Sequence, residues 1–188
     1  QRSIKFPDTE NHKTLVSDLH THSVFSDGHV WPNIRVTEAL KDGVDVLAIT
    51  EHLEYQPHLE DIPNEDRNKA FLEALGAAKG NEILVINGSE ITREMPPGHI
   101  NAVFIKDANK LINIDKSKEK EAQEEIEKRL DQLQGRDRKA INFFALANMW
   151  PVEKAVEEAD NQGAFVFWNN PFWGSQKKDG IAKLTTMH

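Results

Sequence analysis

The chain has 188 residues, of which 38% are hydrophobic and 29% are charged, so we expect one globular domain with a well-solvated surface. Its formal net charge of −8 disfavours a broad nucleic-acid footprint, and no apolar run approaches the roughly 18 residues of a membrane span. With no cysteine, the chain has neither disulfides nor thiolate ligands, so any metal site must use His, Asp and Glu.

Short apolar runs alternate with helical patterns from Leu15 onward, an order typical of a parallel α/β architecture. Most of the runs are nearly continuous, which indicates strands buried on both faces. The predicted strands cover residues 14–19, 45–49, 83–86, 101–105 and 164–168.

Apolar residues recur at helical spacing between these strands, over residues 70–78 and, behind Pro151, over residues 152–159. Both segments are predicted to be helices that face the core. Residues 116–134 are strongly charged and have one narrow apolar stripe, which indicates a solvated surface helix. The polar segments 57–68 and 106–118 are predicted to be loops.

The segment from Asp18 contains the most specific motif, Asp-Leu-His-Thr-His-Ser, which is followed by Asp27 and Gly28. His20 and His22 leave a strand end on the same side, because side chains alternate along a strand with period two. Two imidazoles can then share one cation, and Asp27 brings an oxygen ligand close to them. A simple turn at Asp27 is the alternative for that residue.

The next strands also have potential ligands near their ends. Glu51 and His52 follow the second strand, Glu90 follows the third, and His99 precedes the fourth. An ion pair with Arg93 is the alternative for Glu90. Taken together, the four strands predict a metal cluster. The remaining histidines fit no such pattern and are interpreted as surface residues, namely His12, His29, His58 and His188.

Four motifs resemble those of the PHP (polymerase and histidinol phosphatase) superfamily, over a span from Leu15 to about Pro171. They lie at residues 18–23, 50–52, 88–90 and 98–101. The resemblance implies a single domain over residues 1–188 with a distorted (β/α)7 TIM-like barrel. It also implies phosphoester hydrolysis with up to three divalent zinc, manganese or iron ions at the carboxyl ends of the strands.

The resemblance also implies which residues bind which metal. His20 and His22 would bind a first metal, and Glu90 would bridge the first and the second. His99 would hold the second metal. Asp27 and His52 would hold a third.

Two departures from the family pattern concern the end of the chain. Asn170, in Asn169-Asn170-Pro171, stands where a histidine ligand of the second metal is expected, and a neutral amide is a weaker ligand. The late Asp-x-His motif of the family is absent. We therefore expect the chain to lack its last strands together with their ligands. Its start at Gln1 indicates a processed or partial chain, compatible with a cytoplasmic or a periplasmic location.

The predicted activity is hydrolysis of a small phosphorylated substrate, such as a phosphomonoester or a nucleotide, by water activated on a two- or three-metal cluster. Arg93 is the candidate phosphate clamp, with an ion pair to an acid as the alternative. Trp168, Phe172 and Trp173 either wall a pocket or belong to the core. Two other functions stay open: a non-catalytic PHP-like domain that binds metal or ligand, and a metal-dependent amidohydrolase.

Overall fold

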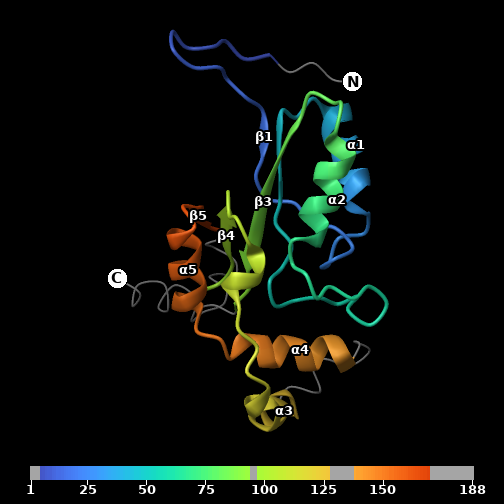
Figure 1. Cartoon of the computed structure of the whole chain (residues 1–188), viewed down its shortest axis with the longest axis vertical. Coiled ribbons are helices and arrows are strands. Elements are labelled where there is room, and N and C mark those ends of the chain that lie inside the picture. The colour runs from blue at the N-terminus through green and yellow to red at the C-terminus, as the bar shows by residue number, and fades with distance from the viewer. Residues whose placement is uncertain (1–4, 94–96, 128–137, 170–188) are drawn as a thin grey trace, which may run out of the picture.

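The computed structural model describes residues 5–93, 97–127 and 138–169, which form one five-stranded sheet and surrounding helices (Figure 1). The sheet has the order β1-β2-β3-β4-β5. Its strands are β1 Ser17–Asp18, β2 Val46–Ile49, β3 Leu84–Ile91, β4 Ile100–Val103 and β5 Phe165–Trp168. The helices are α1 Pro32–Asp42, α2 Lys69–Ala78, α3 Glu119–Glu127, α4 Arg138–Asn148 and α5 Val152–Asn161, with 3₁₀ turns η1 Ala108–Leu111 and η2 Lys116–Lys118.

The expectation of an entirely parallel sheet is wrong for β4. Strands β1, β2 and β3 are parallel, whereas β4 runs antiparallel to both β3 and β5. Only residues 92–99 separate β3 from β4, and a parallel neighbour needs a crossover of about a dozen residues or more. The chain therefore returns as a hairpin, which places the start of β4 at the same edge of the sheet as the end of β3.

The sheet is curled and open within the described residues, where β1 and β5 each pair with a single neighbour. The α/β class is confirmed, and the described strands form about half of a barrel. The distorted (β/α)7 barrel without its last strands, as expected from the sequence, stays a prediction. Helices α1 and α2 lie side by side against one part of the sheet, and α5 lies beside β4 and β5 (Figure 1).

Alternating side chains of the strands divide the core into two faces. Leu47, Ile49 and Val85 pack against α1 and α2 in one buried cluster. The neighbouring positions Val46 and Ile86 point to the opposite face, where they form a second cluster with Ala48 and Val103. Glu90 follows Ile86 by four residues in β3, so the same alternation brings its carboxylate to this second face.

Of the five described α-helices, three were predicted and two were missed. The predictions over residues 70–78 and 152–159 are confirmed as α2 and α5. Helix α1 was missed, although Pro32 at its start and Gly43 at its end, with φ 79°, are the usual signals of helix termini. Helix α4 was also missed.

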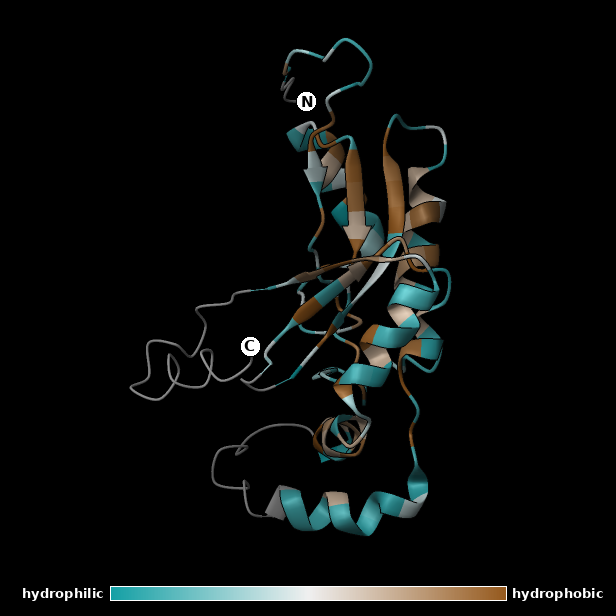
Figure 2. Ribbon diagram, turned by 90° about the vertical axis from the view of Figure 1, so that its left-hand side faces the viewer, coloured by the Kyte–Doolittle hydropathy of each residue, from teal (hydrophilic) through white to brown (hydrophobic). Residues whose placement is uncertain are grey.

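The charged segment forms η2 and α3, and its last residues, 128–134, lie outside the described part of the chain. Figure 2 shows α3 as mainly hydrophilic and β2 as mainly hydrophobic. Among residues 119–125, Ala122 is buried and the others are exposed. The expectation of a solvated surface helix is therefore confirmed for the described part of this segment. No helix among the described residues is both long enough and apolar enough to cross a membrane.

The strand boundaries differ most from the predictions at β1 and β3, and by at most two residues at the other strands. Strand β1 has only two residues, both exposed, where six were expected. Strand β3 continues to Ile91, so Glu90 lies inside the strand rather than behind it. The continuation is stabilised by pairing with β4, in which Glu90 lies opposite Asn101. A single-sequence pattern does not reveal this pairing, because residues 87–90 have no continuous apolar run.

Gly28 closes the turn that follows the His-x-His motif. Its N–H donates to Ser23 O at 2.9 Å, and a Cβ at this position would lie 2.6 Å from His22 O. We expect Gly28→Ala to lower the free energy of unfolding by about 1–3 kcal/mol, measured by chemical denaturation, because backbone atoms would have to move. Gly76→Ala in α2, where a Cβ meets nothing within 4 Å, should instead raise stability by about 0.5–1 kcal/mol. Equal effects of the two substitutions would contradict this interpretation.

Candidate metal centre

The centre of the site is the carboxylate of Glu90, whose side chain is 1% exposed. Four histidines surround it. Glu90 Oε2 lies 3.1 Å from His20 Nε2, 3.0 Å from His22 Nε2 and 3.4 Å from His52 Nδ1. Glu90 Oε1 lies 2.6 Å from His99 Nδ1. The ends of β1, β2 and β3 and the start of β4 therefore meet at one carboxylate.

His20, His22 and Glu90 present three ligand atoms in a nearly equilateral triangle. The two histidine Nε2 atoms are 2.9 Å apart, and each lies 3.0–3.1 Å from Glu90 Oε2. Tetrahedral ligands at about 2.1 Å from a zinc ion stand roughly 3.4 Å apart, close to the observed spacing. Two imidazole nitrogens at this distance also need a proton or a cation between them, so the triangle fits a metal.

Asp27 and His52 form the second part of the site. Asp27 Oδ2 lies 3.4 Å from His52 Nε2, and Asp27 Oδ1 lies 3.9 Å from His22 Nδ1. The rings of His22 and His52 are stacked with centroids 4.4 Å apart. The alternative of a turn role alone for Asp27 does not account for this arrangement, in which its carboxylate faces two imidazoles.

Buried hydrogen bonds shape the loop that contains the His-x-His motif. Glu51 accepts the Ser23 N–H on both carboxylate oxygens, at 2.9 and 3.1 Å, and also accepts the hydroxyl of Ser26. Arg35 of α1 donates its Nε–H to His22 O at 2.7 Å. Glu51 therefore anchors the loop, whereas the next residue, His52, faces the cluster.

Asn169 and Asn101 contribute to the site and were not predicted to do so. Asn169 N–H donates to His99 O at 2.8 Å, and its side-chain amide donates to Asn101 Oδ1 at 2.7 Å and to Glu90 Oε1 at 3.4 Å. Both asparagines are buried. Their position at strand ends beside the motif residues was the available signal, but an amide in a β-strand run is not specific enough for such an assignment.

The structure brings six of the predicted metal ligands together in three overlapping triads. Within each triad the ligand atoms lie within 4.8 Å of one another. The triads are His20-His22-Glu90, His22-Asp27-His52 and His52-Glu90-His99. Nitrogen and oxygen donors without sulfur suit zinc, manganese and iron, so this donor set fits divalent cations of the predicted kinds.

The other predicted residues lie elsewhere or outside the described part. Asn170, Phe172, Trp173 and His188 are outside the described residues. The side chain of Trp168 is 40% exposed and that of Phe167 packs against the core, so the two differ in burial at the end of β5. His12 and His29 are exposed and His58 is half-buried, so at least the first two are surface residues as expected.

Arg93 forms an ion pair with Glu54 rather than with Glu90, while Glu94 lies outside the described residues. Its Nη1 donates to the Glu54 carboxylate and, at 3.0 Å, to Thr92 O, while Nη2 donates to Trp150 O at 2.9 Å. Both side chains are buried, and burial raises the pKa of Glu54 to about 7 against the opposing influence of the Arg93 charge. These contacts correspond to the ion-pair alternative, and the phosphate-clamp role of Arg93 stays a prediction.

The carboxylates and imidazoles of the cluster shift each other's protonation. Burial tends to raise the pKa of Glu90, but hydrogen bonds from His20, His22 and His99 outweigh it and place this pKa well below its ordinary value. The hydrogen bond with His52 lowers the pKa of Asp27. Burial lowers the pKa of His22, yet the hydrogen bond with Glu90 and the nearby negative charges raise it overall. The cluster therefore concentrates negative charge beside imidazoles, as a cation site requires.

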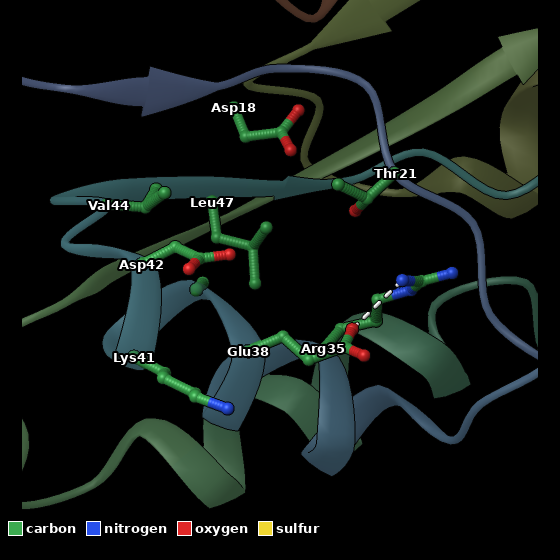
Figure 3. A pocket seen from close by; sticks show the side chains of 9 residues that line it. Asp18, Thr21, Arg35, Glu38, Lys41, Asp42, Val44 and Leu47 are labelled. Carbon is green, nitrogen blue, oxygen red and sulfur yellow. Dashed lines mark hydrogen bonds and ion pairs between the residues drawn. The ribbon is translucent and has the colours of Figure 1, made fainter. Parts of the chain in front are cut away.

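A pocket of about 690 Å³ lies between α1 and the strands β1 and β2 (Figure 3). None of the six clustered residues lines it. Its lining carries both signs of charge, with Asp18, Glu38 and Asp42 against Arg35 and Lys41. Arg35 and Glu38 form an ion pair there at 2.9 Å. The chemistry of the convergent histidines, rather than the size of a hollow, therefore locates the candidate site.

The sequence profile of the PHP domain matches residues 18–121, more than half of the chain, and this segment contains all six clustered residues. The chain belongs to the PHP domain family. The predicted resemblance to PHP proteins is thus confirmed. No curated protein matches the chain significantly.

Solved structures that are similar to this PHP domain include the following two. A two-domain protein from Bacteroides vulgatus that contains a predicted PHP-like metal-dependent phosphoesterase superposes with a TM-score of 0.71 at 39% identity, over 95% of this chain and 41% of that one. The PHP domain described here therefore spans less than half the length of that protein. An amidohydrolase from Chromobacterium violaceum, with bound sulfate and no metal, superposes with a TM-score of 0.52 at 18% identity, over 89% of this chain and 74% of that one. At this identity the similarity shows a shared fold.

Replacing Arg93 with Met tests its role. The variant removes the guanidinium partner of buried Glu54, and we expect the free energy of unfolding to fall by about 3 kcal/mol. This value is near the lower end of the range for breaking a buried ion pair, because Glu54 can take up a proton and lose its charge. Adding Glu54→Gln should restore most of the loss. Unchanged stability together with weaker binding of inorganic phosphate would instead support the clamp role.

The raised pKa of His22 gives a test in the metal-free protein. Its folded-state pKa lies above the ordinary 6.5, so the stability from the protonated ring is fully present below about pH 6.5 and is lost as pH rises through the raised value. An NMR titration should show His22 ionising above 6.5 and, in Glu90→Gln, at a lower pH than in the unmodified protein. A His22 titration at or below 6.5 in the unmodified protein would contradict the electrostatic account.

Proposed function

We propose that this PHP domain hydrolyses phosphoesters of small molecules, such as phosphomonoesters or nucleotides, at the cluster around Glu90. The observation that carries the proposal is the convergence of four histidines and two carboxylates from distant segments into triads whose ligand atoms lie within 4.8 Å. The solved protein at 39% identity, which contains a predicted PHP-like metal-dependent phosphoesterase, supports the same reaction class.

The two oxygens of Glu90 suit a bridging role. Oε2 faces His20 and His22, whereas Oε1 faces His99. We assign His20, His22 and Glu90 to a first cation, and Glu90 and His99 to a second. Asp27 and His52 are assigned to a third, and Asn170 is retained as a predicted ligand of the second.

Two or three zinc, manganese or iron ions bound there would acidify a water molecule toward neutrality and neutralise charge on the phosphoryl oxygens. The protein groups hold this arrangement in place. Asn169 donates to Glu90 Oε1 and so helps to orient the bridging carboxylate, while Glu51 holds the loop between His22 and Asp27. No side chain of the described residues is assigned as a general acid.

The proposal is tested by metal content and hydrolysis in parallel. We expect the purified chain, after incubation with zinc or manganese, to contain two or more cations by elemental analysis and to hydrolyse an aryl phosphate, a phosphodiester or a nucleotide. The double variant His20→Ala with His22→Ala should lose bound cations and at least about 100-fold in activity. This loss should be at least as large as that caused by replacing residues that only contact the metal ligands, which is about 10–100-fold. His12→Ala with His29→Ala is the matched control, because both side chains are exposed.

Three outcomes separate the alternatives that the sequence left open. Stoichiometric metal without hydrolysis of any phosphoester would indicate a non-catalytic binding domain. Preference for amide substrates over phosphoesters would indicate an amidohydrolase. Absence of bound metal from the unmodified chain would overturn the cluster itself.

A further inference from the structure

Two hydroxyl side chains outside the ligand set contact the Nδ1 atoms of two predicted ligands. Thr92 Oγ1 lies 2.6 Å from His52 Nδ1, and Ser26 Oγ lies 3.3 Å from His22 Nδ1. Both hydroxyl residues are buried. Thr92 follows Glu90 by two residues at the end of β3, and Ser26 lies in the loop after the His-x-His motif. The two contacts are thus made by separate segments of the chain.

The proton of each hydroxyl is directed to another group. Thr92 donates to the backbone carbonyl of Glu90 at 3.2 Å, and Ser26 donates to the carboxylate of Glu51. A carbonyl and a carboxylate can only accept, so in each pair the hydroxyl must be the donor. A hydroxyl has one proton and two lone pairs, so the oxygens of Thr92 and Ser26 each direct a lone pair at the nearby histidine Nδ1.

An imidazole that faces such an acceptor donates from Nδ1 and keeps the lone pair of Nε2 free for a cation. For His22, Nε2 lies 2.9 Å from His20 Nε2 and 3.0 Å from Glu90 Oε2. For His52, Nε2 lies 3.4 Å from Asp27 Oδ2. The two free nitrogens therefore point into different parts of the cluster.

Each ring has a second possible partner on its Nδ1 side. His52 Nδ1 lies 3.4 Å from Glu90 Oε2, so this ring could also serve the triad with His99. His22 Nδ1 lies 3.9 Å from Asp27 Oδ1, so it could serve the triad with His52. A neutral imidazole has one free nitrogen, and each ring can take part in only one triad at a time.

We propose that Thr92 and Ser26 are positioning residues that allocate the two histidines between cations. Thr92 commits His52 to the cation shared with Asp27, and Ser26 commits His22 to the cation shared with His20 and Glu90. The inference rests on the metal cluster of the proposed function, which assigns each histidine to a cation, and it adds the two hydroxyl side chains that enforce this assignment.

Zinc binding by two hydroxyl-deletion variants tests the allocation. Equilibrium dialysis against buffered zinc, followed by elemental analysis, should show one zinc ion bound about 10–100-fold more weakly in Thr92→Val and a different one weakened in Ser26→Ala. Asp27→Asn and His20→Ala show which zinc ion is which, because each removes a ligand assigned to only one of the two ions. In an Asp27→Asn background, adding Thr92→Val should not weaken zinc binding further. Adding Ser26→Ala to the same background should weaken zinc binding as much as it does in the unmodified protein.

Matched controls separate a lost hydroxyl from a damaged fold. Thr92→Ser keeps the hydroxyl and should restore zinc affinity. Thr37→Val and Ser117→Ala remove exposed hydroxyls that donate to a backbone carbonyl and to a carboxylate, at 3.1 and 2.6 Å, as Thr92 and Ser26 do. Both controls should leave zinc binding unchanged.

A spectroscopic readout reports the ring nitrogens directly. Long-range ¹H–¹⁵N correlation spectra of the zinc-loaded protein should show His22 and His52 coordinated through Nε2 and protonated at Nδ1. In Thr92→Val only the His52 signals should change, and in Ser26→Ala only those of His22. A merely structural effect would disturb both rings together.

Coordination of His22 or His52 through Nδ1 would overturn the allocation. It would also be overturned if Thr92→Val and Ser26→Ala weakened the binding of all zinc ions equally, or weakened the binding of none. Selective zinc losses without phosphoester hydrolysis would overturn the proposed function and support the allocation. Phosphoester hydrolysis together with unselective zinc losses would support the proposed function and overturn the allocation. Absence of zinc binding would overturn both.

Discussion

Glu90 is a carboxylate placed almost entirely out of water, with nitrogens of four histidines within 3.4 Å of its oxygens. An isolated buried charge is costly, and only partners that donate hydrogen bonds or a bound cation offset that cost. The histidines and the amide of Asn169 supply these contacts. Burial raises the pKa of Glu90, but the histidines outweigh it and hold this pKa well below its usual range. The other features of the site follow from the need to bring these partners to one point.

The sheet meets this need by combining two strand directions. Parallel strands place the segments after β1 and β2 beside Glu90, and the antiparallel β4 brings His99, which precedes its strand, to the same edge. Strand β5 then ends beside His99, so that Asn169 reaches both His99 O and the Glu90 carboxylate. Had β4 been parallel, His99 would have been at the opposite edge of the sheet.

Glu51 and Glu54, which lie close to His52 in the sequence, make structural contacts and do not belong to the proposed metal ligands. Glu51 binds the Ser23 N–H and the Ser26 hydroxyl, and thereby shapes the loop with the His-x-His motif. Glu54 pairs with Arg93, which also donates to Trp150 O between α4 and α5. Together these carboxylates join the loop and the helical part of the domain to the sheet, while Glu90 and Asp27 remain directed to the proposed cations.

The six clustered residues and the family could be predicted from sequence, because strand periodicity places His20 and His22 on one side and the motifs are short and local. The two strongest helical patterns were also visible. The tertiary structure alone decided the antiparallel direction of β4, the length of β3 through Glu90, and the pairing of Arg93 with Glu54. It also revealed the contacts of Ser26, Thr92 and Asn169. Each of these depends on how strands pair or on hydrogen bonds of common polar side chains, for which no residue pattern is specific.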